Sequence, residues 1–247
     1  MTTSLPHRPN TPVSRIGIIG DVHADHEHLA AAIAHLQSLN VQILLCTGDL
    51  CDGTGDLDQC VALLKEHGVH TVRGNHDRWV LQGKARHVAN AHLSEQLSPS
   101  TRDYLNQLPS TIEVETTQGK LLLCHGIGKH DLQKIWPGTS RMPPEPSDTL
   151  DKIIEAGQYR WMINGHVHYR TIIHFQQMTV VNAGTLARRH RPGFSLLDLN
   201  HNHIVGFEFD PVPHCVRKHS LTPCHHTTVF NSTRDFTGNW EPVTLYA

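Results

Sequence analysis

The sequence has no long apolar run, no CxxC pair and no excess of basic residues, and each absence excludes a class of protein. No stretch approaches the roughly 20 apolar residues of a membrane helix, and residues 1–14 lack the apolar core of a secretory signal. The 6 cysteines are scattered, which favours reduced thiols and a cytoplasmic protein. The formal charge of -2 provides no electrostatic footprint for nucleic acid.

Histidine is the residue type that the chain has in abundance, with 22 among 247 residues. It is the commonest metal ligand in proteins, and it carries protons near neutral pH. Several of these residues, such as His7 and His201, lie in polar stretches. Position within the predicted elements must therefore identify the functional ones.

Strand and helix patterns alternate over the first third of the chain. We predict strands at 15–20, 41–48 and 69–74, separated by helices at 26–39 and 57–67. This alternation predicts parallel strands joined by crossover helices, and hence an α/β sheet.

The remainder of the chain combines helices with short strands. Helices are predicted at 76–92, 101–108 and 148–156, a hairpin over 111–116 and 120–125, and a strand at 160–165. Short strands at 171–175, 178–182, 194–199 and 204–209 suggest a second, largely antiparallel sheet. We expect a flexible tail at 1–14, a domain over 15–210 and an irregular C-terminal extension at 211–247. The long loop at 126–146 is of the kind that often acts as a lid.

Five of the strand-like runs lead directly into residues that can bind metal. These residues are Asp21, His23, Asp49, Asn75, His76, His125, His166 and His168. Ligands bind at the carboxyl ends of strands in open α/β sheets, so these side chains should converge. Four of the runs place a glycine before the ligand, which allows close approach of the backbone.

The chemistry of the predicted ligands indicates two metal ions. Four His, two Asp and one Asn are too many donors for one tetrahedral ion, and the absence of thiolates argues against structural zinc. The set suits two divalent ions that share a bridging carboxylate, which is an arrangement used for displacement at phosphorus. Such sites accept manganese, iron, zinc or nickel, and we expect manganese to serve in vitro.

Taken in order, five motifs resemble those of the calcineurin-like metallophosphoesterases over about residues 15–210. They are GDVH (20–23), GDLCD (48–52), GNHD (74–77), CHG (124–126) and GHVH (165–168). The resemblance implies a four-layer αββα sandwich of two mixed β-sheets flanked by helices. It implies one metal on Asp21, His23 and His168, and a second on Asn75, His125 and His166. Asp49 would bridge the two ions, with the water nucleophile also between them.

The same resemblance makes His76 the general acid for the leaving group, oriented by Asp52. This pairing has an independent physical reason. Two dications disfavour protonation of a nearby histidine, whereas a general acid must be protonated, and a carboxylate partner offsets the repulsion. Asp77 is a second candidate partner, although a helix N-cap is its favoured role.

Departures from the motifs narrow the branch of the family. Gly53 and Thr54 follow Asp52 where the protein phosphatase branch has Arg, which argues against a protein phosphatase. GDVHAD (20–25) and NAGT (182–185) are nearer to the small bacterial and archaeal phosphodiesterase branch, although Asp25 stands in place of Asn and adds negative charge. We predict hydrolysis of a small phosphorylated diester or monoester. The alternatives are a non-catalytic scaffold with this fold and a nuclease.

Three weaker signals lie outside these motifs. Lys129, His130, Lys134 and Arg141 in the long loop are candidates for binding an anionic substrate. Arg188, Arg189 and Arg191 favour a solvated charge run over a contact with phosphate. Cys215, His219, Cys224, His225 and His226 fit no zinc-finger spacing and are interpreted as ordinary tail residues.

Overall fold

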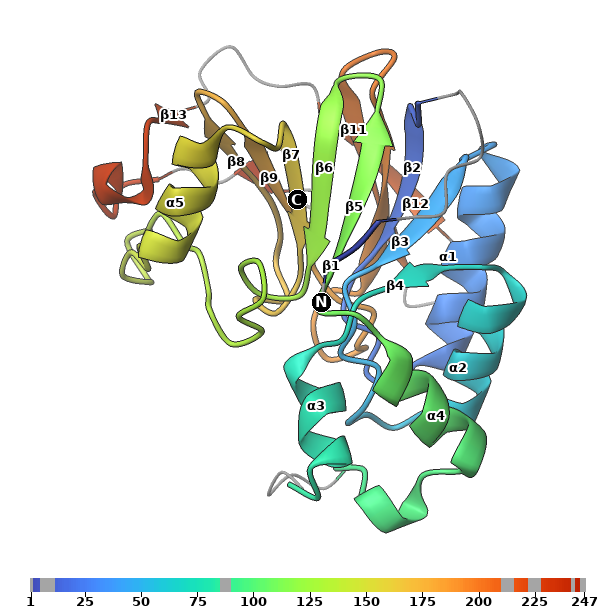
Figure 1. Ribbon diagram of the computed structural model, residues 1–247. Coiled ribbons are helices and arrows are strands. Elements are labelled where there is room, and N and C mark those ends of the chain that lie inside the picture. The colour runs from blue at the N-terminus through green and yellow to red at the C-terminus, as the bar shows by residue number, and fades with distance from the viewer. Residues whose placement is uncertain are drawn as a thin grey trace.

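Two β-sheets face each other in the computed structural model, and helices cover their outer faces (Figure 1). The structure describes residues 2–4, 12–84, 90–209, 216–221, 228–240 and 243–244. No helix within these ranges is long and apolar enough to cross a membrane. The expected sandwich of two mixed sheets flanked by helices is therefore confirmed.

One sheet is built around the first three predicted strands. Its order is β12 (Val216–Leu221), β11 (His203–Phe209), β10 (Gly193–Asp198), β2 (Arg15–Ile19), β3 (Ile43–Cys46) and β4 (His70–Thr71). The strands β2, β3 and β4 are parallel, whereas β10, β11 and β12 are antiparallel to their neighbours. The parallel part arises because α1 (His26–Ser38) and α2 (Leu57–Glu66) provide the crossovers.

The other sheet contains the predicted hairpin. Its order is β1 (Thr2–Ser4), β5 (Thr111–Thr116), β6 (Gly119–Cys124), β7 (Trp161–Asn164), β9 (Thr179–Ala183), β8 (Arg170–Phe175) and β13 (Val229–Phe230), and β14 (Val243–Thr244) also pairs with β8. The strands β6, β7 and β9 are parallel, whereas β5 and β8 run antiparallel to them.

Three buried clusters account for the four layers. Ile16, Ile18, Leu45, Leu121 and Ile163 belong to the cluster between the sheets. Leu29, Ile33 and Leu36 of α1 pack with Phe194 and Leu196 on one outer face, and Leu150 and Ile154 of α5 (Asp148–Ala156) pack with Leu122 and Met162 on the other. Because both faces of each sheet are covered, the central strands are apolar on both sides.

The helices begin at the capping residues that the sequence contains. The carboxylate of Asp25 accepts a hydrogen bond from the backbone N–H of His28 at the start of α1, and Ser147 caps α5 in the same way. The helix α4 spans Pro99–Gln107, close to the predicted 101–108. The helix α3 covers only Asn75–Leu81 of the predicted 76–92, because the chain turns at Gly83 with φ at +69°.

The four short strands after residue 170 do not form one sheet, so that expectation was wrong. The strands β8 and β9 extend the sheet of β7, whereas β10 and β11 extend the sheet of β2. All six residues of β10 are buried, because this strand lies in the interior of its sheet with both faces covered. An apolar pattern identifies a strand but not its partner.

Strands also occur in both terminal segments for which no regular structure was expected. The strand β1 lies in 1–14, and β12, β13 and β14 lie in 211–247. Each pairs with the edge of a sheet that other strands have formed, and such pairing depends weakly on side-chain pattern. Of the C-terminal zinc candidates, His219 lies in β12, and Cys215, Cys224, His225 and His226 lie outside the described residues.

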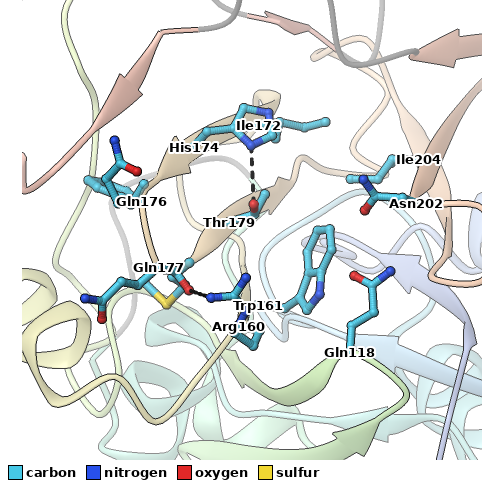
Figure 2. A pocket seen from close by; sticks show the side chains of 12 residues that line it. Gln118, Arg160, Trp161, Ile172, His174, Gln176, Gln177, Thr179, Asn202 and Ile204 are labelled. Carbon is cyan, nitrogen blue, oxygen red and sulfur yellow. Dashed lines mark hydrogen bonds between the residues drawn. The ribbon is translucent and has the colours of Figure 1, made fainter.

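A cavity of about 260 Å³ opens between the sheets beside the N-terminal end of β7. Figure 2 shows Arg160, Trp161, Gln118 and Asn202 around it. The guanidinium of Arg160 donates to the carbonyl oxygen of Gln177 at 3.1 Å. The candidate ligands follow the opposite end of β7, so the cavity and the site occupy opposite ends of the sandwich.

Candidate active site

The predicted ligands meet where the parallel strands of both sheets end. Three groups of side chains each bring their possible ligand atoms within 4.8 Å of one another. The groups are Asp21, His23 and His168; His23, Asp49 and His76; and Asp49, His125 and His166. Asn75 begins α3 beside the third group, with its Oδ1 3.0 Å from Nε2 of His125. The structure therefore brings all seven predicted ligands and the predicted acid into one centre.

The first group is held by hydrogen bonds that leave its ligand atoms directed inward. Oδ1 of the fully buried Asp21 accepts from the Thr47 hydroxyl at 2.8 Å, and Oδ2 accepts from the backbone N–H of His166 at 2.8 Å. Nδ1 of His23 lies 3.0 Å from the carbonyl oxygen of Cys51 and donates to it. Because Nδ1 carries the proton, Nε2 of His23 is left as a ligand atom.

The second group is fixed in the same way. Nδ1 of His125 donates to the carbonyl oxygen of Thr47 at 2.8 Å, so Nε2 is the ring nitrogen that faces the other ligands. Burial opposes protonation of His125, but the charges of Asp49 and Asp21 outweigh it and raise the pKa of His125 to about 10, so the ring is positively charged without a metal. That Nε2 lies 3.3 Å from Oδ2 of Asp49. Asp49 and His23 each belong to two of the three groups, and Asp49 is the one of the two that has two carboxylate oxygens.

The donor set fits divalent metal ions. Nε2 of His23 and Nε2 of His168 are only 3.1 Å apart. Lone pairs of neutral ligands repel one another at this distance unless a cation lies between them. Imidazole nitrogens and carboxylate oxygens are ligands that first-row divalent metals accept.

Burial sets the protonation of these groups. It lowers the pKa of His166 to about 4, helped by the positive charge of His125, and it lowers the pKa of His168 to about 3. Both rings are therefore neutral near pH 7, which is the form that binds metal. Burial also raises the pKa of Asp21 to about 7, and the charge of Asp49 adds to the effect. Two buried carboxylates so close together favour a bound cation.

His76 is placed to donate a proton at the edge of this centre. Its Nδ1 lies 2.6 Å from Oδ2 of Asp52, and its backbone N–H donates to Oδ1 of Asp49 at 2.8 Å. Its Nε2 lies 3.7 Å from Oδ2 of Asp49. Burial opposes ionisation of Asp52, but the hydrogen bonds and charges of His76 and His92 together outweigh it and lower the pKa of Asp52.

Asp77 supports the start of α3, although the N-cap of this helix is Gly74 and Asp77 is its third residue. Its Oδ2 accepts from the backbone N–H of Gly74 at 3.0 Å, at the start of α3, and its Oδ1 accepts from that of Leu50 at 2.8 Å. The fully buried carboxylate therefore joins α3 to the loop that carries Asp49.

Left-handed backbone conformations concentrate in the ligand loops. Positive φ angles occur at His23 (47°), Ala24 (57°), Asp49 (45°), Asp52 (66°), His166 (69°) and His168 (63°). Each such residue costs about 1–2 kcal/mol relative to right-handed backbone. Glycine permits the close packing between them, because a Cβ at Gly165 would lie 2.1 Å from Oδ1 of Asp21.

Two histidines at the centre were not singled out from the sequence. The ring of His190 lies 4.9 Å from the ring of His168. The backbone N–H of Asp52 donates to Nδ1 of His92 at 2.9 Å, and the backbone N–H of His92 donates to Oδ1 of Asp52 at 2.8 Å. Neither residue belongs to a motif, so the only signal was the high histidine content.

The weaker signals have specific outcomes. Arg188 forms an ion pair with Asp25 at 3.0 Å and a second with Glu27, and its side chain remains 56% exposed, in agreement with the solvated charge that was favoured for it. The extra negative charge of Asp25 is thereby neutralised. In the long loop, the positive charge of exposed Lys134 contributes to the low pKa of His166.

A family model for the calcineurin-like phosphoesterase superfamily domain matches residues 15–202. The chain belongs to this superfamily. This superfamily is metal-dependent. Solved structures with a similar fold are found for other proteins. A metallophosphoesterase from Sphaerobacter thermophilus aligns with a TM-score of 0.56 and 20% identity, covering 84% of this chain and 88% of that one. A proposed diadenosine tetraphosphatase aligns with a TM-score of 0.54 and 19% identity, covering 90% and 98%.

Among curated proteins, an uncharacterised protein from Methanocaldococcus jannaschii is 25% identical over 163 residues. The match covers 63% of this chain and 64% of that protein, so the phosphoesterase chain spans less than two thirds of its relative. These likenesses support the family and the fold. The roles of individual residues at the centre remain predictions, which the geometry described above supports.

Proposed function

We propose that this phosphoesterase uses two divalent metal ions to hydrolyse a small phosphorylated diester or monoester. Asp21, His23 and His168 would hold one ion, and Asn75, His125 and His166 the other, with Asp49 between them. Two such ions would supply an activated water and would neutralise charge on the phosphoryl oxygens. Manganese, iron, zinc and nickel all suit this donor set.

The observation that carries the proposal is the 2.6 Å contact between His76 and Asp52 beside the shared carboxylate of Asp49. The Asp52 carboxylate accepts from Nδ1–H of His76, so Nε2 is the ring atom that can give a proton to the leaving-group oxygen. Asp52 also stabilises the protonated imidazole next to the metal centre. A non-catalytic scaffold would need the fold but not this acid pair.

The charge of the chain favours a small substrate over a polymer. A nuclease binds many phosphates and normally carries a clear basic excess, whereas this chain has a formal charge of -2. The positive charge of exposed Lys134 is felt at His166, where it helps to lower the pKa, and the same charge would attract a compact anion.

The test uses purified protein reconstituted with Mn²⁺, Fe²⁺, Zn²⁺ or Ni²⁺ and two chromogenic esters, bis(p-nitrophenyl) phosphate and p-nitrophenyl phosphate. We expect metal-dependent release of p-nitrophenol from at least one ester. His76→Asn should retain both metal ions, because it removes the acid and no ligand. It should lower kcat by roughly 100-fold for an alkyl ester of phosphate, whose poor leaving group needs the acid, and far less for the p-nitrophenyl esters.

His166→Ala and Asp49→Asn should lower both metal content and activity, since each removes a ligand. His201→Asn is the matched control, because this side chain is 77% exposed at the other end of the molecule. Activity that survives both ligand substitutions would contradict the proposed centre.

A further inference from the structure

The structure assigns His92 a role as a positioning residue, which holds the Asp52 carboxylate in the orientation that His76 requires. The observation is a reciprocal pair of hydrogen bonds across 40 positions of sequence. The backbone N–H of Asp52 donates to Nδ1 of His92 at 2.9 Å, and the backbone N–H of His92 donates to Oδ1 of Asp52 at 2.8 Å. The inference rests on the proposed acid role of His76.

Each oxygen of the Asp52 carboxylate has its own partner. Oδ1 accepts from the backbone of His92, and Oδ2 accepts from Nδ1 of His76 at 2.6 Å. Rotation of the carboxylate would break at least one of these hydrogen bonds, so the pair restricts it to one orientation. That orientation keeps the proton on Nδ1 of His76 and directs Nε2 toward the centre.

The imidazole of His92 also supports the backbone of Asp52. Asp52 has φ at 66°, a conformation that non-glycine residues adopt at a free-energy cost. Its N–H finds an acceptor in the half-buried ring of His92, which must therefore be unprotonated at Nδ1. Burial lowers the pKa of His92, which agrees with a neutral ring.

His92 lies on a segment that is itself anchored. The short helix η1 (Ser94–Gln96) follows it, and Arg102 of α4 donates to the Ser94 hydroxyl at 3.1 Å. The contact between His92 and Asp52 therefore links the α4 side of the molecule to the acid pair. A contact between two anchored segments can position a side chain, whereas a contact between mobile loops cannot.

The experiment compares His92→Ala, His92→Asn and His92→Gln in the Mn²⁺-loaded full chain. Asn places its side-chain oxygen close to the position of Nδ1 and so keeps an acceptor for the N–H of Asp52. Gln places its oxygen nearer to the position of Nε2 and does not. Asn and Gln thus form a matched pair of similar polarity that differ in the position of the acceptor.

The readout is the dependence of kcat on the leaving group, measured with p-nitrophenyl, phenyl and alkyl esters of phosphate. A general acid matters most when the leaving group is poor. We expect His92→Ala and His92→Gln to lower kcat for the phenyl and alkyl esters by about 10-fold, within the usual range for supporting residues. Effects on the p-nitrophenyl ester should stay within about twofold, and KM should change little. His92→Asn should restore kcat to within about threefold of the wild type.

Two results would overturn the inference. One is a uniform loss across all leaving groups, and the other is equal behaviour of His92→Asn and His92→Gln. Failure of the proposed function would look different, because His76→Asn would then show no leaving-group dependence, or the wild type would hydrolyse no ester. Metal content and thermal midpoint, measured for each variant, identify any that have lost the fold. The comparison of His92→Asn with His92→Gln then decides whether the acceptor at the position of Nδ1 matters.

Discussion

The loops at the two ends of the sandwich place different residue types in left-handed backbone. At the end with the cavity, Asn40 before β3 and Asn202 between β10 and β11 adopt left-handed backbone, with φ at 56° and 49°. Asparagine is among the non-glycine residues that tolerate this region best. At the other end, the non-glycine residues with left-handed backbone are His23, Ala24, Asp49, Asp52, His166 and His168, and five of these six carry predicted site roles.

The difference indicates that the residues at the cavity end suit the backbone conformation of the turns, whereas those at the site end suit the chemistry of the site. Strained backbone persists only where the surrounding structure determines it. Here that structure consists of buried clusters in three layers, together with hydrogen bonds such as the one from His166 N–H to Asp21. We therefore expect residues at the site end to lower the stability of the fold while they support activity, and residues at the cavity end to contribute to stability alone.

The largest expected effect comes from Asp21→Asn. The change removes a ligand carboxylate and should lower kcat/KM by roughly 1000-fold, about 4 kcal/mol of transition-state stabilisation. Burial raises the pKa of Asp21 to about 7, so the metal-free wild type must ionise an unfavourable carboxyl at pH 8. The isosteric amide avoids this, and its thermal midpoint in EDTA should rise by a few degrees.

Asp198→Asn provides the matched change at the cavity end. Burial opposes ionisation of Asp198, but His201 and Arg15 outweigh it and lower its pKa. This variant should lose thermal stability and keep full activity. A fall in the midpoint for Asp21→Asn, or a loss of activity for Asp198→Asn, would contradict the proposed difference between the ends.

The second prediction concerns the wall of the cavity. Trp161 is 7% exposed and packs in the cluster between the sheets. Trp161→Ala should lower the free energy of unfolding by about 3 kcal/mol, because it removes a large buried side chain. Activity at 25 °C should stay within about twofold, since the substitution lies at the other end of β7. Urea denaturation and the chromogenic assay measure the two quantities, and a large fall in kcat would show that the ends are coupled.

Much of this architecture could be predicted from local sequence. Leu29, Ile33 and Leu36 recur at helical spacing and were expected on one buried face of a helix, where the structure has them. The site residues could be placed at one edge because each follows an apolar run, and the carboxyl ends of parallel strands share an edge. Their roles as ligands stay predictions.

The parts that could not be predicted depend on contacts between distant segments. No local pattern indicates that β10 pairs with β2, because Phe194 and Leu196 would suit the interior of either sheet. The same holds for His92, whose importance arises only when its segment meets Asp52. The ion pair between Arg188 and Asp25 joins residues 163 positions apart, so no local pattern indicated it either.

The third prediction concerns how the stability of the metal-free protein depends on pH through His168 at the site end. Burial lowers the pKa of His168 from 6.5 to about 3, so below pH 6.5 the folded state binds fewer protons than the unfolded state. The stability contributed by this residue is complete above pH 6.5 and is lost as the pH falls toward about 3. Between pH 7 and pH 5 the loss should be about 1.5 kcal/mol, reduced for the partial exposure of the ring.

His168→Asn removes this titration, so its free energy of unfolding in EDTA should fall less between pH 7 and pH 5 than that of the wild type. His201→Asn, at the exposed position, should follow the wild-type curve. Parallel curves for wild type and His168→Asn would show that burial of this ring does not destabilise the site end in acid.

The smallest effect is expected at Asn202, in the turn between β10 and β11. Asn202→Ala should lower the free energy of unfolding by about 0.5–1 kcal/mol, because alanine tolerates φ at 49° less well than asparagine. Asn202→Gly should be nearly neutral, since glycine adopts this φ without strain but loses more entropy on folding. Both variants should keep wild-type kcat and metal content. Urea denaturation resolves such differences when the variants are measured together, and an effect of Asn202→Gly as large as that of Asn202→Ala would mean that the side chain, rather than its tolerance of left-handed backbone, stabilises this turn.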